Sequence, residues 1–345
     1  MILDKHPERI AILRALQLGD MLCAVPVFRA IRMARPQAHI TLIGLPWARA
    51  FVRRFSAYLD DFIEFPGFPG LPERETAPQQ VLEFLLEAQR RRFDLAIQLQ
   101  GSGSHVNECV RLLGARRSAG FYRDGDVVPD EALFVPWPDT GTETQRLLRV
   151  LEPLGITPQG EALEFPPLTE DVAHLRAVPE TIAMGAYCCV HPGARFASRR
   201  WRTERFAAVA DSIAAEGFGI VLTGVDDEAS VTADVKRQMR APCLDLTGRL
   251  TLGALATVLR GARLVVCNDT GVSHIAAALG TPSVVVACGS DAVRWAPADA
   301  QRHRVLWHDV PCRPCMHAEC PIGHVCALGV SEADVMAAAS AALRS

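Results

Sequence analysis

The sequence predicts an α/β protein built from two parallel β-sheets, each wrapped by helices. Short apolar runs alternate with amphipathic segments along the chain, which is the pattern of strands and helices in a parallel sheet. The chain has 345 residues, which is too long for one core of ordinary size and fits two domains. Proline and glycine concentrate between residues 153 and 167, where one series of strands and helices ends and another begins.

The first series defines a domain at residues 1–165. Apolar runs predict strands at 10–16, 40–45 and 95–99, and apolar residues at helical spacing predict helices at 22–33, before Pro36, and at 81–89.

The second series defines a domain at residues 166–330. The same patterns predict strands at 187–190, 219–222, 264–267 and 283–287, with helices at 206–215, before Gly217, and at 252–259. A last helix is predicted within residues 331–345, because Ser331 and Asp334 have the spacing of a helix cap.

Charge and hydropathy exclude several classes of protein. The net charge of −3 gives no strongly basic surface, so we expect no nucleic-acid partner. The charged N-terminus and the lack of any apolar run of about 18 residues predict a cytoplasmic protein with no leader or membrane span. A small basic cluster, Arg49 with Arg53 and Arg54, is either a solvated helix face or a contact to an anionic acceptor or to lipid headgroups of the inner membrane.

The eleven cysteines form two groups. Seven lie in apolar stretches and are expected to be small buried hydrophobes without disulfides: Cys23, Cys109, Cys188, Cys189, Cys243, Cys267 and Cys288. The other four, Cys312, Cys315, Cys320 and Cys326, lie close together among three histidines, His308, His317 and His324. They are either ligands of a structural zinc or iron ion or, since the spacing matches no common zinc module, a segment that binds no metal.

A polar turn at residues 268–274 follows a predicted strand and opens a helix of small residues. The first helix amides, the Thr270 hydroxyl and the His274 imidazole could converge there on a diphosphate. The Asp269 carboxylate would repel a diphosphate, so it is expected to cap the helix or order the turn. The alternative is that the segment is only a good turn and helix cap.

A second loop, at residues 190–201, follows another strand and carries Arg195, Arg199 and Arg200. Guanidinium groups bind diphosphates with two parallel hydrogen bonds and keep their charge at neutral pH. Arg195 and Arg199 are therefore expected to hold a leaving diphosphate. The alternative is a surface loop whose arginines pair with acids such as Glu204.

In the first domain, Asp20 follows the first predicted strand, at the edge of the sheet where open α/β folds bind ligands. It is expected to act as a general base, as a helix cap, or as both. The turn at residues 100–104 follows another strand and could line the same cleft. Neither turn has the Gly-x-Gly-x-x-Gly pattern, which argues against a nicotinamide enzyme.

Together these segments resemble glycosyltransferase family nine, the ADP-heptose:lipopolysaccharide heptosyltransferases. The resemblance covers Leu18-Gly19-Asp20 with Pro26 downstream, and residues 94–101, 191–201, 222–228 and 269–282. Asp-Thr-Gly-x-Ser-His together with Leu-Gly-Asp near the N-terminus is its most specific part.

The resemblance implies the GT-B fold, in which two Rossmann-like domains face each other across a cleft. The N-terminal domain would bind the acceptor and the C-terminal domain the nucleotide sugar, with the last helix packing back on the first domain. The residues that match the family's functional positions are Asp20 as the base, Asp269, Thr270, Gly271 and His274 at the diphosphate, Glu228 at the ribose and, more weakly, Leu250 beside the base of the nucleotide.

The implied activity is inverting transfer of a heptose or related sugar from an ADP-sugar to a lipopolysaccharide core or similar glycan. Arg199 would stabilise the departing diphosphate in place of a metal, so no cofactor is expected for catalysis. The chain carries Arg199 and Arg202 where the family usually has lysine and proline, which leaves the preferred sugar open. Two alternatives remain: a nucleotide-sugar epimerase, and a nucleotide-sugar-binding protein without transferase activity.

Overall fold

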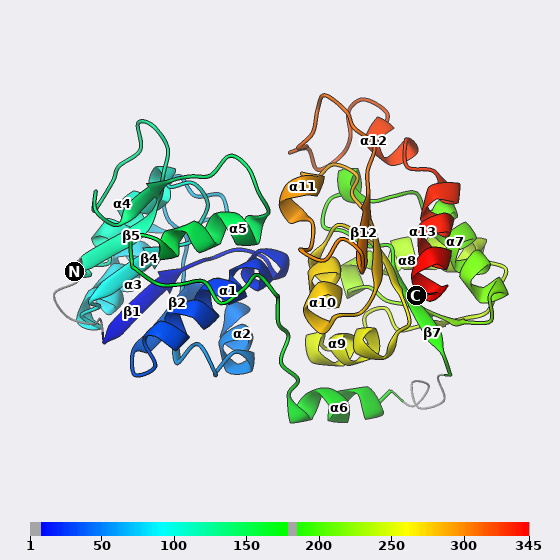
Figure 1. The fold of residues 1–345 in the computed structure, drawn as a ribbon, viewed down its shortest axis with the longest axis horizontal. Coiled ribbons are helices and arrows are strands. Elements are labelled where there is room, and N and C mark those ends of the chain that lie inside the picture. Colours follow the sequence, from blue (N-terminus) through cyan, green and yellow to red (C-terminus); the bar gives the residue numbers. More distant parts are fainter. Residues whose placement is uncertain (1–7, 179–184, 345) are drawn as a thin grey trace. The chain divides into compact units, whose positions relative to one another are not determined.

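The computed structural model describes residues 8–178 and 185–344. Residues 1–7, part of the segment in which we expect no leader, lie outside this description. The chain divides into two compact units, Met1–Ala162 and Leu163–Ser345, close to the boundary expected after residue 165. Each unit contains one six-stranded sheet (Figure 1).

The first unit alternates strands and helices from its start. Its elements are β1 (Arg9–Leu13), α1 (Leu18–Ala34), β2 (His39–Gly44), α2 (Ala48–Arg54), β3 (Asp61–Glu64), α3 (Pro78–Arg90), β4 (Leu95–Gln98), α4 (Ser104–Leu112), β5 (Arg117–Tyr122), β6 (Phe134–Pro136), α5 (Glu143–Leu148) and the 3-10 turn η1 (Arg149–Leu151).

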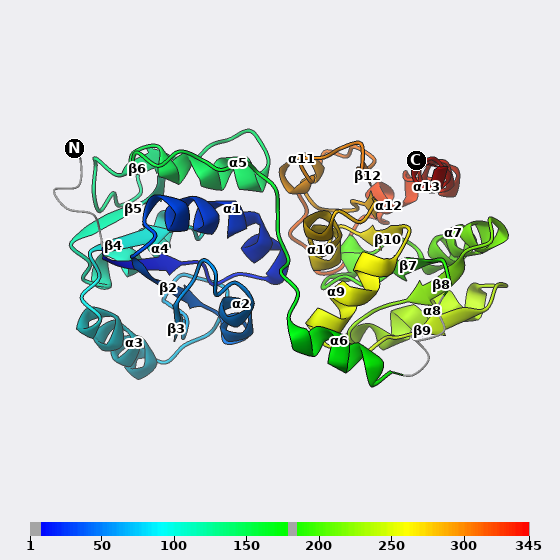
Figure 2. The ribbon, with the colours of Figure 1, turned by 60° about the horizontal axis from the view of Figure 1, so that its bottom comes forward.

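The strand order of the first sheet is β3-β2-β1-β4-β5-β6, with all neighbours parallel. The order reverses between β1 and β4, where Leu13 pairs with Gln98. Helices α3 and α4 pack on one face of the sheet, through Phe84, Ala88 and Val110. Figure 2 shows α1 and α5 on the opposite face. Because both faces are covered, β1 is apolar along most of its length, as the sequence predicted.

The second unit repeats this design. Its elements are α6 (Thr169–Arg176), β7 (Tyr187–His191), the 3-10 turn η3 (Ala197–Arg199), α7 (Thr203–Ala215), β8 (Gly219–Leu222), the 3-10 turn η4 (Asp226–Glu228), α8 (Ala229–Gln238), β9 (Cys243–Asp245), α9 (Leu252–Gly261), β10 (Val265–Asn268), α10 (Gly271–Leu279), β11 (Ser283–Val286), α11 (Ala292–Trp295), β12 (His303–Leu306), α12 (Val325–Leu328) and α13 (Glu332–Arg344).

The strand order of the second sheet is β12-β11-β10-β7-β8-β9, again parallel throughout. Its order reverses between β7 and β10, where His191 pairs with Cys267. Both units therefore have the Rossmann strand order, and in such sheets ligands bind at the carboxyl ends of the strands that flank the reversal. The predicted α/β class with two Rossmann-like domains is confirmed.

The predicted C-terminal helix is present as α13. Its residues Val335, Ala339 and Leu343 are spaced four apart and join the core of the second unit. There α13 lies beside α7 and against β11 (Figure 1). Its expected packing on the first domain stays a prediction.

One predicted helix boundary differs from the structure in an informative way. Helix α1 begins at Leu18 and not at residue 22, with Pro26 in its interior. An internal proline costs a helix about 3 kcal/mol. The helix continues because eleven of its residues, Pro26 among them, are buried.

Candidate functional site

The first half of the site lies at the reversal between β1 and β4. Asp20 is half-buried in the first turn of α1, where a carboxylate interacts favourably with the helix dipole. The residue at the cap position is Gln17, so the interpretation of Asp20 as the helix cap is wrong. That interpretation assumed a helix starting after Asp20, whereas the helix starts two residues before it.

Arg14, which the sequence reasoning missed, holds this turn in place. Its side chain is fully buried directly after β1. Its Nε donates to the Asp20 carbonyl at 2.8 Å, one terminal nitrogen donates to the Leu99 carbonyl, and the other pairs with Glu143 Oε1 at 3.2 Å. One guanidinium thus connects the Asp20 turn, the end of β4 and the start of α5. The sequence feature that could have identified Arg14 is a charged residue at the end of an apolar strand.

The turn at residues 100–104 lies at the same edge of the sheet. The Ala15 amide donates to Gln100 Oε1 at 2.6 Å, and Gln98 Nε2 donates to the Gly101 carbonyl at 3.3 Å. The bond between Ala15 and Gln100 therefore joins the segment that leads to Asp20 to the turn at 100–104.

The second half of the site lies at the reversal between β7 and β10. The side chain of Asn268, which is fully buried, accepts a hydrogen bond from the Trp201 amide at 2.9 Å. Its amide nitrogen donates to the carbonyls of Pro192 and Gly193 at 2.8 and 3.3 Å. The arginine loop at 190–201 and the polar turn at 268–274 are thereby held side by side.

Within the polar turn, Thr270 caps α10. Its hydroxyl accepts a hydrogen bond from the Val272 amide at 3.4 Å, and its carbonyl accepts one from the Ser273 amide at 3.0 Å. The expectation that Asp269 caps the helix is wrong, because Gly271 is the first helical residue and Asp269 lies one position too early. The Asp269 backbone amide donates to the Val286 carbonyl of β11 at 3.1 Å, which extends the β10–β11 pairing by one residue, and the ordering of the turn by the Asp269 carboxylate stays a prediction.

His274 is buried in α10, with 5% of its surface exposed. Its ring lies edge-to-face against Trp295, with 6.1 Å between the ring centroids. The predicted diphosphate contact would therefore come from an imidazole whose orientation is restricted by aromatic packing.

Arg199 ends the 3-10 turn η3 and is half-buried. One of its terminal nitrogens donates to the Cys315 carbonyl at 2.9 Å. Its buried Nε has no hydrogen-bond partner among the described residues. An unsatisfied buried donor is costly, and a phosphate oxygen is a suitable acceptor for it.

Arg199 and Asp269 both act on the Cys288 thiol beyond the end of β11. Burial raises the pKa of this thiol, the Asp269 carboxylate raises it further, and the Arg199 guanidinium lowers it. The Arg199 side chain lies near the end of β11, because a Cβ on Gly289 would be 3.7 Å from Arg199 Cδ.

The other loop arginines differ from Arg199. Arg195 is exposed, with its guanidinium carbon 5.3 Å from the centroid of the Phe196 ring. Glu204 pairs with Arg202, one residue after the loop, while Arg200 Nε donates to the Ala194 carbonyl at 2.9 Å.

Glu228 lies in the next loop along, after β8, and is buried. Its Oε2 accepts a hydrogen bond from the Val225 amide at 3.0 Å and lies 3.4 Å from His191 Nε2. Burial lowers the pKa of His191, which keeps its imidazole neutral at pH 7, although Glu228 opposes this effect. A Cβ on Gly193 would lie 2.1 Å from Glu228 Cδ, so only glycine allows the carboxyl group to lie there.

Leu250 is half-buried, one residue before Thr251, the cap of α9. Its segment adjoins the loop after β8, because the Gly248 amide donates to the Gly224 carbonyl at 2.9 Å.

All eleven cysteines lie within the described residues and are free. Of the seven expected to be buried, six are, and Cys243 is half-buried. In the second group Cys312 is exposed and Cys326 is buried. No cluster of three or more His, Cys, Asp or Glu side chains in the described ranges could hold a metal ion, so the structure gives no support for a structural metal at these cysteines.

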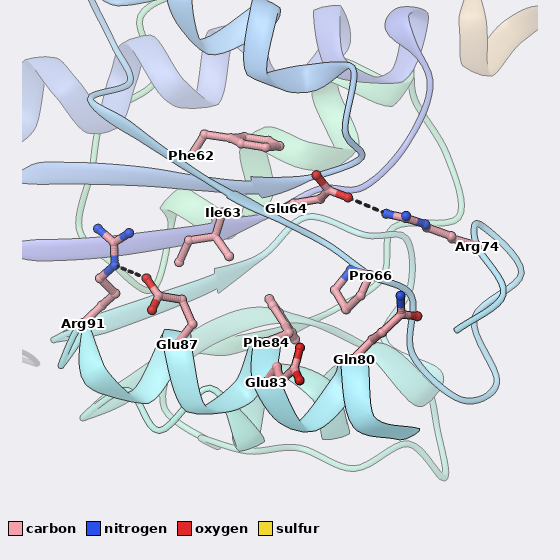
Figure 3. A pocket seen from close by; sticks show the side chains of 10 residues that line it. All are labelled: Phe62, Ile63, Glu64, Pro66, Arg74, Gln80, Glu83, Phe84, Glu87 and Arg91. Carbon is pink, nitrogen blue, oxygen red and sulfur yellow. Dashed lines mark hydrogen bonds and ion pairs between the residues drawn. The ribbon is translucent and has the colours of Figure 1, made fainter. Parts of the chain in front are cut away.

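A hollow of about 360 Å³ lies elsewhere in the first unit, between β3 and α3 (Figure 3). Glu64 pairs with Arg74 at 2.8 Å on one side of it, and Glu87 pairs with Arg91 at 2.8 Å on the other. None of the predicted site residues lines it.

The basic cluster lies on α2, where the Arg49 guanidinium carbon is 4.9 Å from the centroid of the Phe62 ring. Across residues 8–178 and 185–344, no helix combines the length and the apolar character needed to span a membrane.

Comparison with known proteins adds the family. Residues 85–326 match the model of glycosyltransferase family 9 (heptosyltransferase). A lipopolysaccharide heptosyltransferase 3 of Escherichia coli is 26% identical over 300 residues, which cover 81% of this chain and 83% of that protein.

Two solved structures share the fold. The family 9 glycosyltransferase from Veillonella parvula has a TM-score of 0.79 at 21% identity, covering 100% of this chain and 99% of the other. The E. coli heptosyltransferase WaaC with ADP has a TM-score of 0.65 at 18% identity, covering 98% and 100%. The predicted GT-B fold class is confirmed. The family model matches well over half of the chain, with the Asp269 turn and the Arg199 loop inside the matched range, and the chain therefore belongs to glycosyltransferase family 9, the heptosyltransferases.

Proposed function

We propose that this glycosyltransferase moves a heptose, or a related sugar, from an ADP-sugar to a lipopolysaccharide core or similar glycan acceptor. The proposal includes inversion at the anomeric carbon and independence of metal ions. The relative named above is a lipopolysaccharide heptosyltransferase, and one structural neighbour is described with ADP. The observation that carries the donor side is the buried Arg199 Nε without a partner in the described chain, in a loop that the Asn268 side chain holds against the Asp269 turn.

The proposed binding site for the donor is formed by the loops at the carboxyl ends of β7 and β10. Arg199, with the exposed Arg195 of the same loop, would hold the diphosphate of the donor. Thr270, Gly271 and His274 would line it from the start of α10, where the helix dipole favours an anion. Glu228 would contact the ribose, and Leu250 would pack beside the base of the nucleotide.

The proposed reaction begins with the acceptor hydroxyl. Asp20 would take the proton of the acceptor hydroxyl while the oxygen forms a bond to the anomeric carbon. The bond between that carbon and the diphosphate breaks at the same time, and ADP leaves with the electron pair. Negative charge grows on the diphosphate, and the Arg199 guanidinium would stabilise it.

The two units would divide these tasks. We assign the acceptor to the first domain, residues 1–165, and the nucleotide sugar to the second, residues 166–330. With a lipid-linked acceptor, the reaction would take place at the cytoplasmic face of the inner membrane, where Arg49 and Arg53 of α2 could contact anionic headgroups.

The donor is tested by thermal-shift measurements with ADP, UDP, GDP and CMP. ADP at about a hundred times its dissociation constant is expected to add about 2.7 kcal/mol of stability and to raise the unfolding midpoint by several degrees. ADP-heptose is then incubated with a truncated lipopolysaccharide core, and heptose transfer is measured by mass spectrometry.

Three results would contradict parts of this proposal. Preference for UDP or GDP would exclude ADP-heptose as the donor. Interconversion of the sugar without an acceptor would identify an epimerase. Donor binding with neither reaction would identify a binding protein.

Removal of divalent cations is expected to leave the transfer rate unchanged within about twofold, because arginine charges stabilise the leaving group. The measurement compares the initial rate in EDTA with the rate after adding back Mg²⁺ or Mn²⁺. A rate that falls at least tenfold in EDTA and returns with one metal would refute metal independence.

A further inference from the structure

The cysteine-rich segment, defined as residues 312–326, has no task in the proposed reaction. In the structure it lies against the loop that carries Arg199. These contacts carry the inference that follows.

Ser198, the residue before Arg199, has all three of its polar atoms bonded to this segment. The Ser198 amide donates to the Ala318 carbonyl at 3.0 Å, and its hydroxyl donates to the His317 carbonyl at 2.5 Å. The Ser198 carbonyl accepts a hydrogen bond from His324 Nε2 at 2.9 Å. Only 2% of the Ser198 surface is exposed, so these bonds are shielded from water.

Arg199 itself is held by the same segment. The Cys315 carbonyl accepts a hydrogen bond from one of its terminal nitrogens at 2.9 Å. This hydrogen bond engages one side of the planar Arg199 guanidinium and therefore limits the rotation of the side chain. The buried Nε is left to bond a ligand.

The segment is in turn anchored to the end of β11. The Cys315 amide donates to the Gly289 carbonyl at 2.7 Å, and Arg313 donates to the carbonyls of Ala287 and Cys288 at 3.1 and 2.7 Å. A Cβ on Gly289 would lie 3.0 Å from Cys315 Cβ and 3.4 Å from the Ser198 carbonyl oxygen. The segment thus connects the sheet edge to the Arg199 loop at close range.

We propose that the cysteine-rich segment positions Arg199 for the leaving diphosphate, with Ser198 and His324 as its positioning residues. Neither side chain contacts substrate. They act by fixing the backbone from which Arg199 extends, and a displacement of about 1 Å at such a group can cost a hundredfold in rate. This inference rests on the proposed role of Arg199 in diphosphate binding.

The test is a double-mutant cycle read by the dissociation constant for ADP and by kcat. His324→Phe removes the donor to the Ser198 carbonyl and keeps a ring of similar size. We expect it to weaken ADP binding about tenfold in the wild-type background and less than twofold in an Arg199→Ala background, because it acts through Arg199. His324→Gln, which retains a side-chain N–H donor, should restore most of the loss. Met316→Ala is the control, since 84% of the Met316 surface is exposed in the same segment, and it should change neither value.

If His324→Phe does not fold, Ser198→Ala, which removes only the bond to the His317 carbonyl, is taken through the same cycle. Equal losses in both backgrounds would overturn the inference and leave the proposed function standing. If the wild type binds UDP or GDP instead of ADP, the ADP donor is excluded and the cycle is read with that nucleotide. If no nucleoside diphosphate binds, the inference and the proposed function both fail.

Discussion

Asp20→Asn is expected to reduce turnover at least a hundredfold while the dissociation constant for ADP changes less than twofold. A well-placed general base contributes about a hundredfold to ten-thousandfold to the rate, and the amide of asparagine cannot accept the proton. The amide has nearly the shape of the carboxylate, and the Asp20 contact to Arg14 uses the backbone carbonyl, so the turn should be preserved. ADP binding should persist because the proposed donor residues belong to the second unit.

The measurement compares single-turnover transfer rates, with ADP affinity determined by calorimetry. Asp124→Asn is the matched control, because Asp124 is an exposed aspartate of the same unit and its substitution should leave both values unchanged. Near-normal turnover by Asp20→Asn would refute Asp20 as the base. Loss of ADP binding would instead indicate that the substitution disturbs more than the acceptor side.

Arg14→Met is expected to lower the free energy of unfolding by about 3–5 kcal/mol, because it leaves the Glu143 carboxylate buried without its cation. Both side chains are almost fully buried, with 0% and 2% of their surfaces exposed. The substitution also removes the donors to the carbonyls of Asp20 and Leu99. For a domain of this size the loss corresponds to a fall of about 10 °C in the unfolding midpoint.

Urea and thermal unfolding test this expectation. Arg123→Met serves as the control, because the Arg123–Asp139 pair is largely exposed and its loss should cost at most about 1 kcal/mol. Adding Glu143→Leu to Arg14→Met should recover part of the stability, because the buried carboxylate that has lost the Arg14 cation is then removed. If Arg14→Met costs no more than the exposed control, the buried pair is not what holds the Asp20 turn.

Predictions from local pattern held well for elements with regular apolar spacing. The helix expected at 206–215 is α7, the strand expected at 219–222 is β8, and the last helix is α13. Elements with weaker patterns were missed, among them α6 and β9. Strand β9 has three residues, all half-buried, and so carries almost no periodic signal.

The sequence predicted the candidate site as a set of loops. The predicted roles of single residues in those loops as helix caps were less accurate. The turns around Asp20 and Asp269 do follow strands at the two reversals of strand order. The cap of α10, however, is Thr270 and not Asp269, and the cap of α1 is Gln17 and not Asp20. Several polar residues can cap a helix, and sequence alone does not say at which of them the helical conformation begins.

The sequence by itself determined the α/β class, the two Rossmann-like units, the family resemblance and the loops that carry the candidate chemistry. The α/β class and the loops depend on periodicity and on turns, which involve residues close together in the chain, whereas the Rossmann-like units were expected from the family resemblance. Only the tertiary structure decided that Arg14 pairs with Glu143, 129 residues later, and that Ser198 bonds to His317, 119 residues later. Such contacts depend on which strands lie next to each other in the sheet and on which buried polar groups then need hydrogen-bond partners. Neither can be predicted from residues that are close together in the sequence.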